Sequence, residues 1–123
     1  MNKKTVVFDF DGVVHAYTSG WKGFDVITDP VVKEAADAIS VLRSDGYEVI
    51  IVSTRCAEAT GLEAVKKYLT DNNIEVDDVV THKPPALAYI DDRAICFTPG
   101  IDIVSAVKNL VPWHVNAEYT SKE

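Results

Sequence analysis

The chain has 123 residues, 47% of them hydrophobic, and a formal net charge of −7. Its length suits one domain with a sizeable core, and its negative charge argues against a protein that binds nucleic acid or an anionic membrane over a broad surface. No stretch approaches the ~20 consecutive apolar residues that cross a bilayer, so we expect no membrane partner.

The predicted elements alternate between strands and helices along the chain. The first is an apolar strand over residues 5–10, followed by a loop over residues 13–30. Asp29 is the expected N-cap of the first helix, with Pro30 as its first residue and Gly46 as its stop. The later predicted strands cover residues 47–53, 76–82, 86–90 and 94–97, and the later predicted helices cover residues 58–72 and 101–110.

This alternation predicts an α/β fold. Strand–helix–strand units form parallel sheets with right-handed crossovers, so we expect a three-layer, Rossmann-like fold around a central, mostly parallel, five-stranded sheet. The expected domain covers residues 1–113, and residues 114–123 form a polar C-terminal tail. Ligands of such sheets bind beyond the carboxyl ends of the strands, so the strand ends are where a site is expected.

Two cysteines, Cys56 and Cys96, show neither metal-ligand nor redox spacing. The first residues lead directly into a strand pattern, without the apolar segment of a signal peptide. The simplest interpretation is a reduced, cytoplasmic protein.

Polar residues follow three of the predicted strands. Asp9 and Asp11 end the first, residues 53–55 (Ser-Thr-Arg) end the second, and residues 91–93 (Asp-Asp-Arg) end the fourth, which residues 82–85 (His-Lys-Pro-Pro) precede. Carboxylates that converge at one edge of a sheet repel one another unless a cation lies among them, and an all-oxygen ligand set favours Mg²⁺ over zinc. A hydroxyl and a lysine beside such a site indicate a pocket for a phosphoryl group.

The stretch "FDFDGVV" resembles motif I (hhhDxDGxh) of the haloacid dehalogenase-like (HAD) phosphohydrolases. Ser53 resembles the motif II hydroxyl of that superfamily, Lys83 its motif III lysine, and "YIDDR" its motif IV acidic pair. The four motifs occur in order over about residues 5–100. Within the superfamily, "VSTR" followed by "IDDR" resembles the 3′-phosphatase domain of bacteriophage polynucleotide kinases, and also short phage and bacterial HAD proteins.

The resemblance implies a Mg²⁺-dependent phosphatase that acts through an aspartyl-phosphate. Asp9 would be the nucleophile, and Asp11 the general acid for the leaving oxygen and then the base for water. The implied Mg²⁺ ligands are Asp9, the backbone carbonyl of Asp11, and Asp91 or Asp92, a choice that the sequence leaves open.

The remaining implied roles concern the phosphoryl group. Lys83 and Ser53 would stabilise charge on its oxygens, although Thr54 is an alternative hydroxyl. Gly12 would let the chain turn away from the first strand beside the substrate. Arg55 and Arg93 suit either a substrate contact or an ion pair with the acidic residues.

Three aromatic or imidazole side chains near motif I are given structural roles. We expect His15 to be structural or exposed, and Trp21 and Phe24 to form a local core of the loop over residues 13–30.

The motif spacing predicts that the site carries no cap domain. Residues 12–52 hold one loop and one helix, and residues 54–82 hold one helix and one strand, so neither interval has room for an inserted domain. An open site would take a small or a large phosphorylated substrate. Candidates are a small phosphate ester, a phosphorylated protein and a nucleic-acid 3′-phosphate end.

Two other classes of protein share some of these features. A receiver domain needs a phospho-accepting aspartate at the end of its third strand, and "VVTH" offers none. A non-catalytic HAD-like module that binds phosphate or Mg²⁺ is the stronger alternative, although the presence of both Asp9 and Asp11 favours an enzyme.

Overall fold

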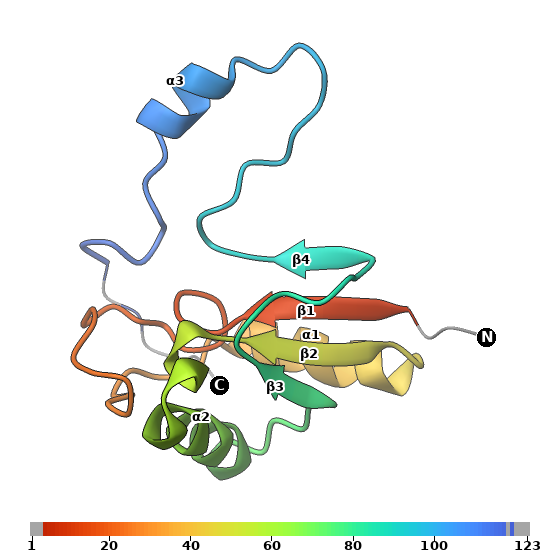
Figure 1. Cartoon of the computed structure of the whole chain (residues 1–123), viewed down its shortest axis with the longest axis vertical. Helices are drawn as coiled ribbons and strands as arrows, with labels where there is room; N and C mark the ends of the chain where they lie inside the picture. The colour runs from red at the N-terminus through yellow and green to blue at the C-terminus, as the bar shows by residue number, and fades with distance from the viewer. Residues whose placement is uncertain (1–3, 118, 120–123) are drawn as a thin grey trace.

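The computed structural model describes residues 4–117 and 119, which form an α/β domain around a parallel sheet (Figure 1). The sheet has four strands in the order β3-β2-β1-β4. Their bounds are β1 (Thr5–Asp9), β2 (Glu48–Val52), β3 (Asp78–Val80) and β4 (Ala88–Ile90). The predicted parallel α/β architecture is therefore confirmed.

Among the residues described, three α-helices accompany the sheet, together with one short 3₁₀ helix. They are α1 (Lys33–Ser44), α2 (Ala59–Asp71), α3 (Ile103–Lys108) and the 3₁₀ helix η1 (Thr54–Ala57). Within the described part of the chain, none of the helices has the length and hydropathy needed to cross a bilayer.

The predicted fifth strand over residues 94–97 is wrong. These residues have no strand hydrogen bonds, and Phe97 is 62% exposed. The run is only four residues long, and Pro99 and Gly100 follow it almost at once. Without a neighbouring strand or apolar cover, its β-branched and aromatic residues are not enough to hold it in the sheet.

The predicted start of the first helix is also wrong. The helix begins at Lys33 rather than Pro30, and its N-cap, Val32, makes no side-chain cap. The Asp29 carboxylate instead accepts hydrogen bonds from the backbone N–H and the hydroxyl of Ser19, at 2.8 and 2.6 Å. The predicted stop is confirmed, because Gly46 follows the helix with a φ of +92°.

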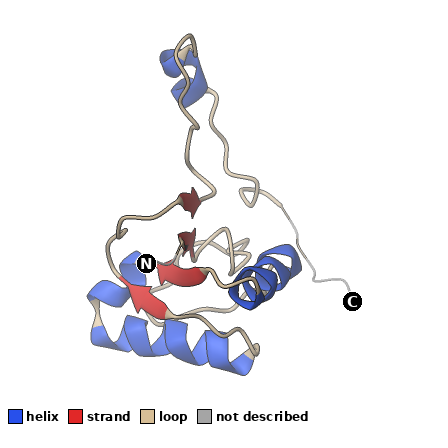
Figure 2. Ribbon diagram, turned by 90° about the vertical axis from the view of Figure 1, so that its right-hand side faces the viewer, coloured by secondary structure: helices blue, strands red, loops and turns tan. Residues whose placement is uncertain are grey.

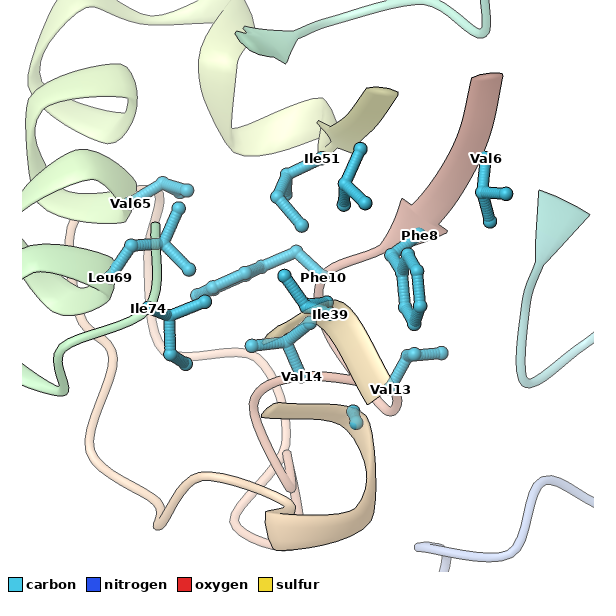
Figure 3. Close-up of a cluster of buried hydrophobic side chains, with 12 residues drawn as sticks. Val6, Phe8, Phe10, Val13, Val14, Ile39, Ile51, Val65, Leu69 and Ile74 are labelled. Carbon is cyan, nitrogen blue, oxygen red and sulfur yellow. The ribbon is translucent and has the colours of Figure 1, made fainter. Parts of the chain in front are cut away.

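Alternate side chains of β1 and β2 point to opposite faces of the sheet and pack into an apolar cluster on each face. On one face, Phe8 and Phe10 pack with residues of α1 and α2 in one buried cluster (Figure 3). On the other face, Val7, Ile50 and Val52 form a smaller cluster, covered by Val80 and Ala86. Each buried side chain of this size contributes roughly 1.5–3 kcal/mol, so the carboxyl ends of β1 and β2 are held firmly.

Residues 93–112, which we call the arm, leave the body of the domain. Figures 1 and 2 both show α3 standing away from the sheet at the end of the arm. The apolar side chains of Ile103, Val104 and Val107 are 51%, 62% and 59% exposed. The helix is shorter than the predicted 101–110, and Asp102 is its N-cap.

The chain returns to the body after the arm. His114, the first residue of the predicted polar tail, is buried, with 6% of its surface exposed. The tail therefore does not begin as a free segment at residue 114. Of the rest of that prediction, residues 118 and 120–123 lie outside the described residues.

Candidate functional site

The carboxyl ends of three neighbouring strands carry most of the predicted site residues. Asp9 is the last residue of β1, and Ser53 follows β2 directly. Asp91 and Asp92 follow β4, on the other side of β1. Because the strands are parallel, these segments meet at one edge of the sheet, where the arrowheads of Figure 1 point.

Asp9, Asp91 and Asp92 form a cluster of carboxylates whose ligand atoms lie within 4.8 Å of one another. Burial is the main cause that raises the pKa of Asp9 to about 7, and the charges of Asp91 and Asp92 add to it. Burial also disfavours the ionised form of Asp91, but hydrogen bonds from the Arg93 N–H and the Lys83 ammonium lower the pKa of that carboxyl overall. The cluster concentrates negative charge that a cation relieves.

Asp92 gives a second, independent indication of a ligand. Its side chain is 2% exposed, and its Oδ2 lies 2.6 Å from Nε2 of His114. Its other oxygen, Oδ1, is buried without a hydrogen-bond partner, a costly arrangement in a folded protein. This all-oxygen set fits a hard divalent cation such as Mg²⁺, which Asp9, Asp91 and Asp92 would hold.

Asp11 points to a different set of partners. Its Oδ2 accepts a hydrogen bond from Nε of Arg55 at 2.8 Å, and its Oδ1 lies 2.8 Å from Nδ1 of His15. The backbone N–H of Asp29 donates to Nε2 of His15 at 3.0 Å. This bond assigns the His15 proton to Nδ1, which donates it to Asp11. A metal contact through the backbone carbonyl of Asp11 stays a prediction.

Arg55 is the largest fully buried side chain among the described residues. Its Nη1 donates to three loop carbonyl oxygens at 2.7, 3.0 and 3.1 Å, those of Gly23, Phe24 and Val26. Its guanidinium also lies 4.7 Å from the ring centroid of Trp21. Of the two roles that the sequence left open for Arg55, the ion pair is the one found here, with Asp11 as its partner.

A pocket of about 120 Å³ opens at this edge of the sheet. Its walls are formed by Asp9, Asp11, Tyr17, Trp21, Ser53, Thr54, Asp92 and Arg93. Pockets that enclose a whole small molecule usually measure roughly 300–1,000 Å³. This pocket therefore has room for a group of phosphoryl size and leaves the rest of a substrate outside.

The two candidate hydroxyls, of Ser53 and Thr54, both line the pocket. The Oγ of Ser53 accepts the backbone N–H of Arg55 at 3.1 Å and caps η1. Accepting this bond leaves the Ser53 O–H proton to donate into the pocket. Ser53 is buried, whereas Thr54 is exposed at the rim.

Lys83, Arg93 and Gly12 occupy three different places. Nζ of Lys83 lies 3.1 Å from Oδ2 of Asp91, so the half-exposed lysine reaches the carboxylate cluster from outside. Arg93 is exposed and lines the pocket. Gly12 has a φ of +83°, and a Cβ there would lie 2.7 Å from Nε2 of His114. Gly12 thus permits a close approach within the protein, and its predicted substrate contact stays a prediction.

Three residues at the site were not predicted from the sequence: Tyr17, Trp113 and His114. Tyr17 lines the pocket with a φ of +62°, a strained value for a bulky residue that no sequence pattern announces. The signal for the other two was an aromatic residue and an imidazole a few residues after the last helix, α3 (Ile103–Lys108). Trp21 contacts Phe24 edge-on, but the two residues are 48% and 37% exposed, so the predicted local core of the loop is wrong. Trp21 instead forms a wall of the pocket.

A larger hollow lies away from this site. It measures about 690 Å³ and lies beside β3 and the carboxyl ends of α1 and α2. Its Arg43 is held by ion pairs with Glu75 and Asp77. These contacts join α1 to the segment before β3, which gives this hollow a structural role.

No family model matches the chain, and no curated protein or solved structure shows significant similarity to it. Inferences about its function therefore rest on the residues and geometry of the site.

Proposed function

We propose that the chain is a Mg²⁺-dependent phosphatase that hydrolyses a phosphate monoester through an aspartyl-phosphate on Asp9. The observation that carries the proposal is the cluster of Asp9, Asp91 and Asp92 beside a phosphoryl-sized pocket. The pKa of Asp9, raised to about 7, adds support because strongly perturbed carboxyls in a pocket are typical of functional sites.

Asp9 is the proposed nucleophile because its carboxylate both lines the pocket and belongs to the cluster. As a carboxylate oxygen of Asp9 bonds to phosphorus, the bond from phosphorus to the leaving oxygen breaks. Bound Mg²⁺ would supply positive charge that favours the ionised form of Asp9 and offsets the charge of the phosphoryl oxygens.

Asp11 is the proposed acid and base. It lines the same pocket, and Arg55 and His15 hold its carboxylate in one orientation. In the first step Asp11 starts in its protonated form and gives that proton to the leaving oxygen, which leaves it as the carboxylate that accepts hydrogen bonds from Arg55 and His15. In the second it takes a proton from the water that releases phosphate from Asp9.

Ser53, Lys83 and Arg93 complete the proposed binding of the phosphoryl group. Ser53 donates its O–H to a phosphoryl oxygen, Arg93 brings positive charge from the wall of the pocket, and Lys83 brings it from its place beside Asp91. The small pocket encloses the phosphoryl group, while the leaving group stays outside it. This supports an open site, for which a small ester and a nucleic-acid 3′-phosphate end are both substrates to test.

The same features support a place among the capless HAD-like phosphohydrolases, with their layered, Rossmann-like fold. Motif I begins at the end of β1 and continues into the loop after it, the motif II hydroxyl follows β2, and the lysine and the acidic pair flank β4 in a parallel sheet. Cys56 and Cys96 are both free thiols, which supports a reducing compartment such as the cytoplasm.

The test is hydrolysis of an aryl phosphate, followed by 3′- and 5′-phosphorylated oligonucleotides, nucleotides and sugar phosphates. We expect turnover with MgCl₂, none with EDTA, and none from Asp9→Asn, which removes the nucleophile and a metal ligand together. Asp71→Asn is the matched control, because Asp71 is an exposed carboxylate on α2 that pairs only with Lys67 among the contacts described. Substantial activity of Asp9→Asn, or of the wild type in EDTA, would overturn the proposal.

A further inference from the structure

The segment that follows the arm is built into the candidate site. His114 contacts Asp92 through Nε2 at 2.6 Å, and both side chains are more than nine-tenths buried. The acceptor is a carboxylate oxygen, so Nε2 carries the proton and donates it. A donor–acceptor distance this short is typical of a charge-assisted hydrogen bond.

Further contacts keep His114 in this position. Nε1 of Trp113 donates to the carbonyl oxygen of Gly12 at 2.6 Å, and the Tyr17 ring packs edge-on against His114 with 5.3 Å between centroids. Any side chain at position 12 would collide with Asp92 and His114. The glycine of motif I, the strained Tyr17 and the C-terminal segment therefore fit one another.

The bond from His114 leaves Asp92 with one oxygen for another ligand. Oδ2 is used by His114, and Oδ1 is the buried oxygen without a partner. A carboxylate that binds a metal through one oxygen is commonly held by a hydrogen bond to the other, which fixes its rotation and its distance from the metal. Both oxygens of Asp91 already accept a hydrogen bond, one from Lys83 and one from the Arg93 N–H, so Asp91 would bind the cation through the remaining lone pair of one of them.

We propose that His114 is a positioning residue that holds Asp92 so that Oδ1 faces the divalent cation of the site. This inference rests on the proposed function, because it assumes that the carboxylate cluster binds a cation. It also gives the arm a defined place, since the residues that flank it, Asp92 and Trp113, both make hydrogen bonds within the site. The C-terminal segment is thus part of the metal site although it is remote from the motifs in sequence.

The experiment measures binding of Mn²⁺ to the full chain by electron paramagnetic resonance, without substrate. His114→Leu removes the donor and should weaken binding roughly tenfold to a hundredfold, as is usual when a hydrogen bond to a metal ligand is lost. His114→Gln, whose amide nitrogen can reach the place of Nε2, should restore most of the affinity. In an Asp92→Ala background, which offers no acceptor to either side chain, the two substitutions should have equal effects, because the interaction that separates them is gone.

The possible outcomes separate this inference from the proposed function. Wild-type protein that binds no Mn²⁺ at millimolar concentration would overturn the metal site, and with it both proposals. Affinity unchanged in His114→Leu would overturn only the role of His114. If His114→Leu fails the circular dichroism check for folding, His114→Asn replaces it: its amide is too short to reach Asp92, so wild-type affinity in that variant would equally overturn the inference.

Discussion

The two halves of the candidate site are held in place by different means. The β1–β2 half, which carries Asp9 and Ser53, continues strands that are buried on both faces of the sheet. The β4 half, which carries Asp91 and Asp92, follows a three-residue edge strand whose Tyr89 and Ile90 are 45% and 41% exposed. The first half is therefore positioned by the core, and the second mainly by polar contacts within the site.

This difference assigns separate tasks to the polar residues. In the β1–β2 half, Arg55 and His15 orient a carboxylate and fasten the loop above it. In the β4 half, Lys83 and His114 each bind one aspartate of the cluster. The first pair acts within a packed domain, whereas the second replaces packing that the edge strand lacks.

The largest expected effect comes from breaking the polar network of the β1–β2 half. Arg55→Met should lower the free energy of unfolding by about 3–5 kcal/mol, because it leaves the Asp11 carboxylate without its cation and three loop carbonyls without a donor. Urea denaturation followed by circular dichroism measures it.

Arg43→Met is the matched control for that experiment. Like Arg55, Arg43 forms ion pairs, but its partners are the carboxylates of Glu75 and Asp77 and the pairs lie at the surface of the protein. Exposed ion pairs contribute little to stability, so this variant should lose far less. Equal losses in the two variants would show that the buried network contributes no more than a surface one.

The β1–β2 half could be predicted from sequence because its signals are local. Apolar runs defined β1 and β2, and the polar residues at their carboxyl ends were Asp9, the last residue of β1, and Ser53, the residue after β2. The parallel order of the strands then brings these ends together, as expected for alternating strands and helices.

The features that the sequence did not predict depend on contacts between residues far apart in the chain. Asp29 has the residue type and position of an N-cap, but Ser19 and His15 engage it instead. His114 lies in a polar segment, and its burial depends on Asp92, 22 positions earlier. Residues 94–97 have the composition of a strand without a partner strand to pair with, and composition alone does not supply one.

The second-largest effect on stability is expected from the negative charge of the carboxylate cluster, whose members Asp9, Asp91 and Asp92 come from both halves of the site. Without metal, the pKa of Asp9 in the folded protein is about 7, above its ordinary value of 3.8, so the folded state binds this proton more tightly than the unfolded state. The stability that Asp9 contributes is thus full below about pH 4 and is lost as the pH rises through about 7. Mg²⁺ needs the ionised form, so its stabilising effect should grow over the same range.

Thermal melting between pH 5 and pH 8, in EDTA and in MgCl₂, measures this effect. At a hundred times its dissociation constant, Mg²⁺ should add about 2.7 kcal/mol at pH 8 and much less at pH 5. In EDTA, the melting temperature of the wild type relative to Asp9→Asn should fall as the pH rises. A difference that stays constant with pH would mean that neither burial nor the neighbouring carboxylates raise the pKa of Asp9.

The smallest expected effect comes from the arm, where the comparison between packed and unpacked regions is most direct. Val107 on α3 is 59% exposed, whereas Ile39 on α1 is 1% exposed in the main core. Ile39→Ala should cost about 2–5 kcal/mol, because it removes buried methyl groups and leaves a cavity. Val107→Ala should stay within about 0.5 kcal/mol, since little buried surface is lost and alanine favours the helix slightly more than valine does. Urea denaturation of both variants at one protein concentration decides the matter. A loss at Val107 close to that at Ile39 would mean that another surface covers the apolar side of α3 in solution, and the arm would then be held by packing as the β1–β2 half is.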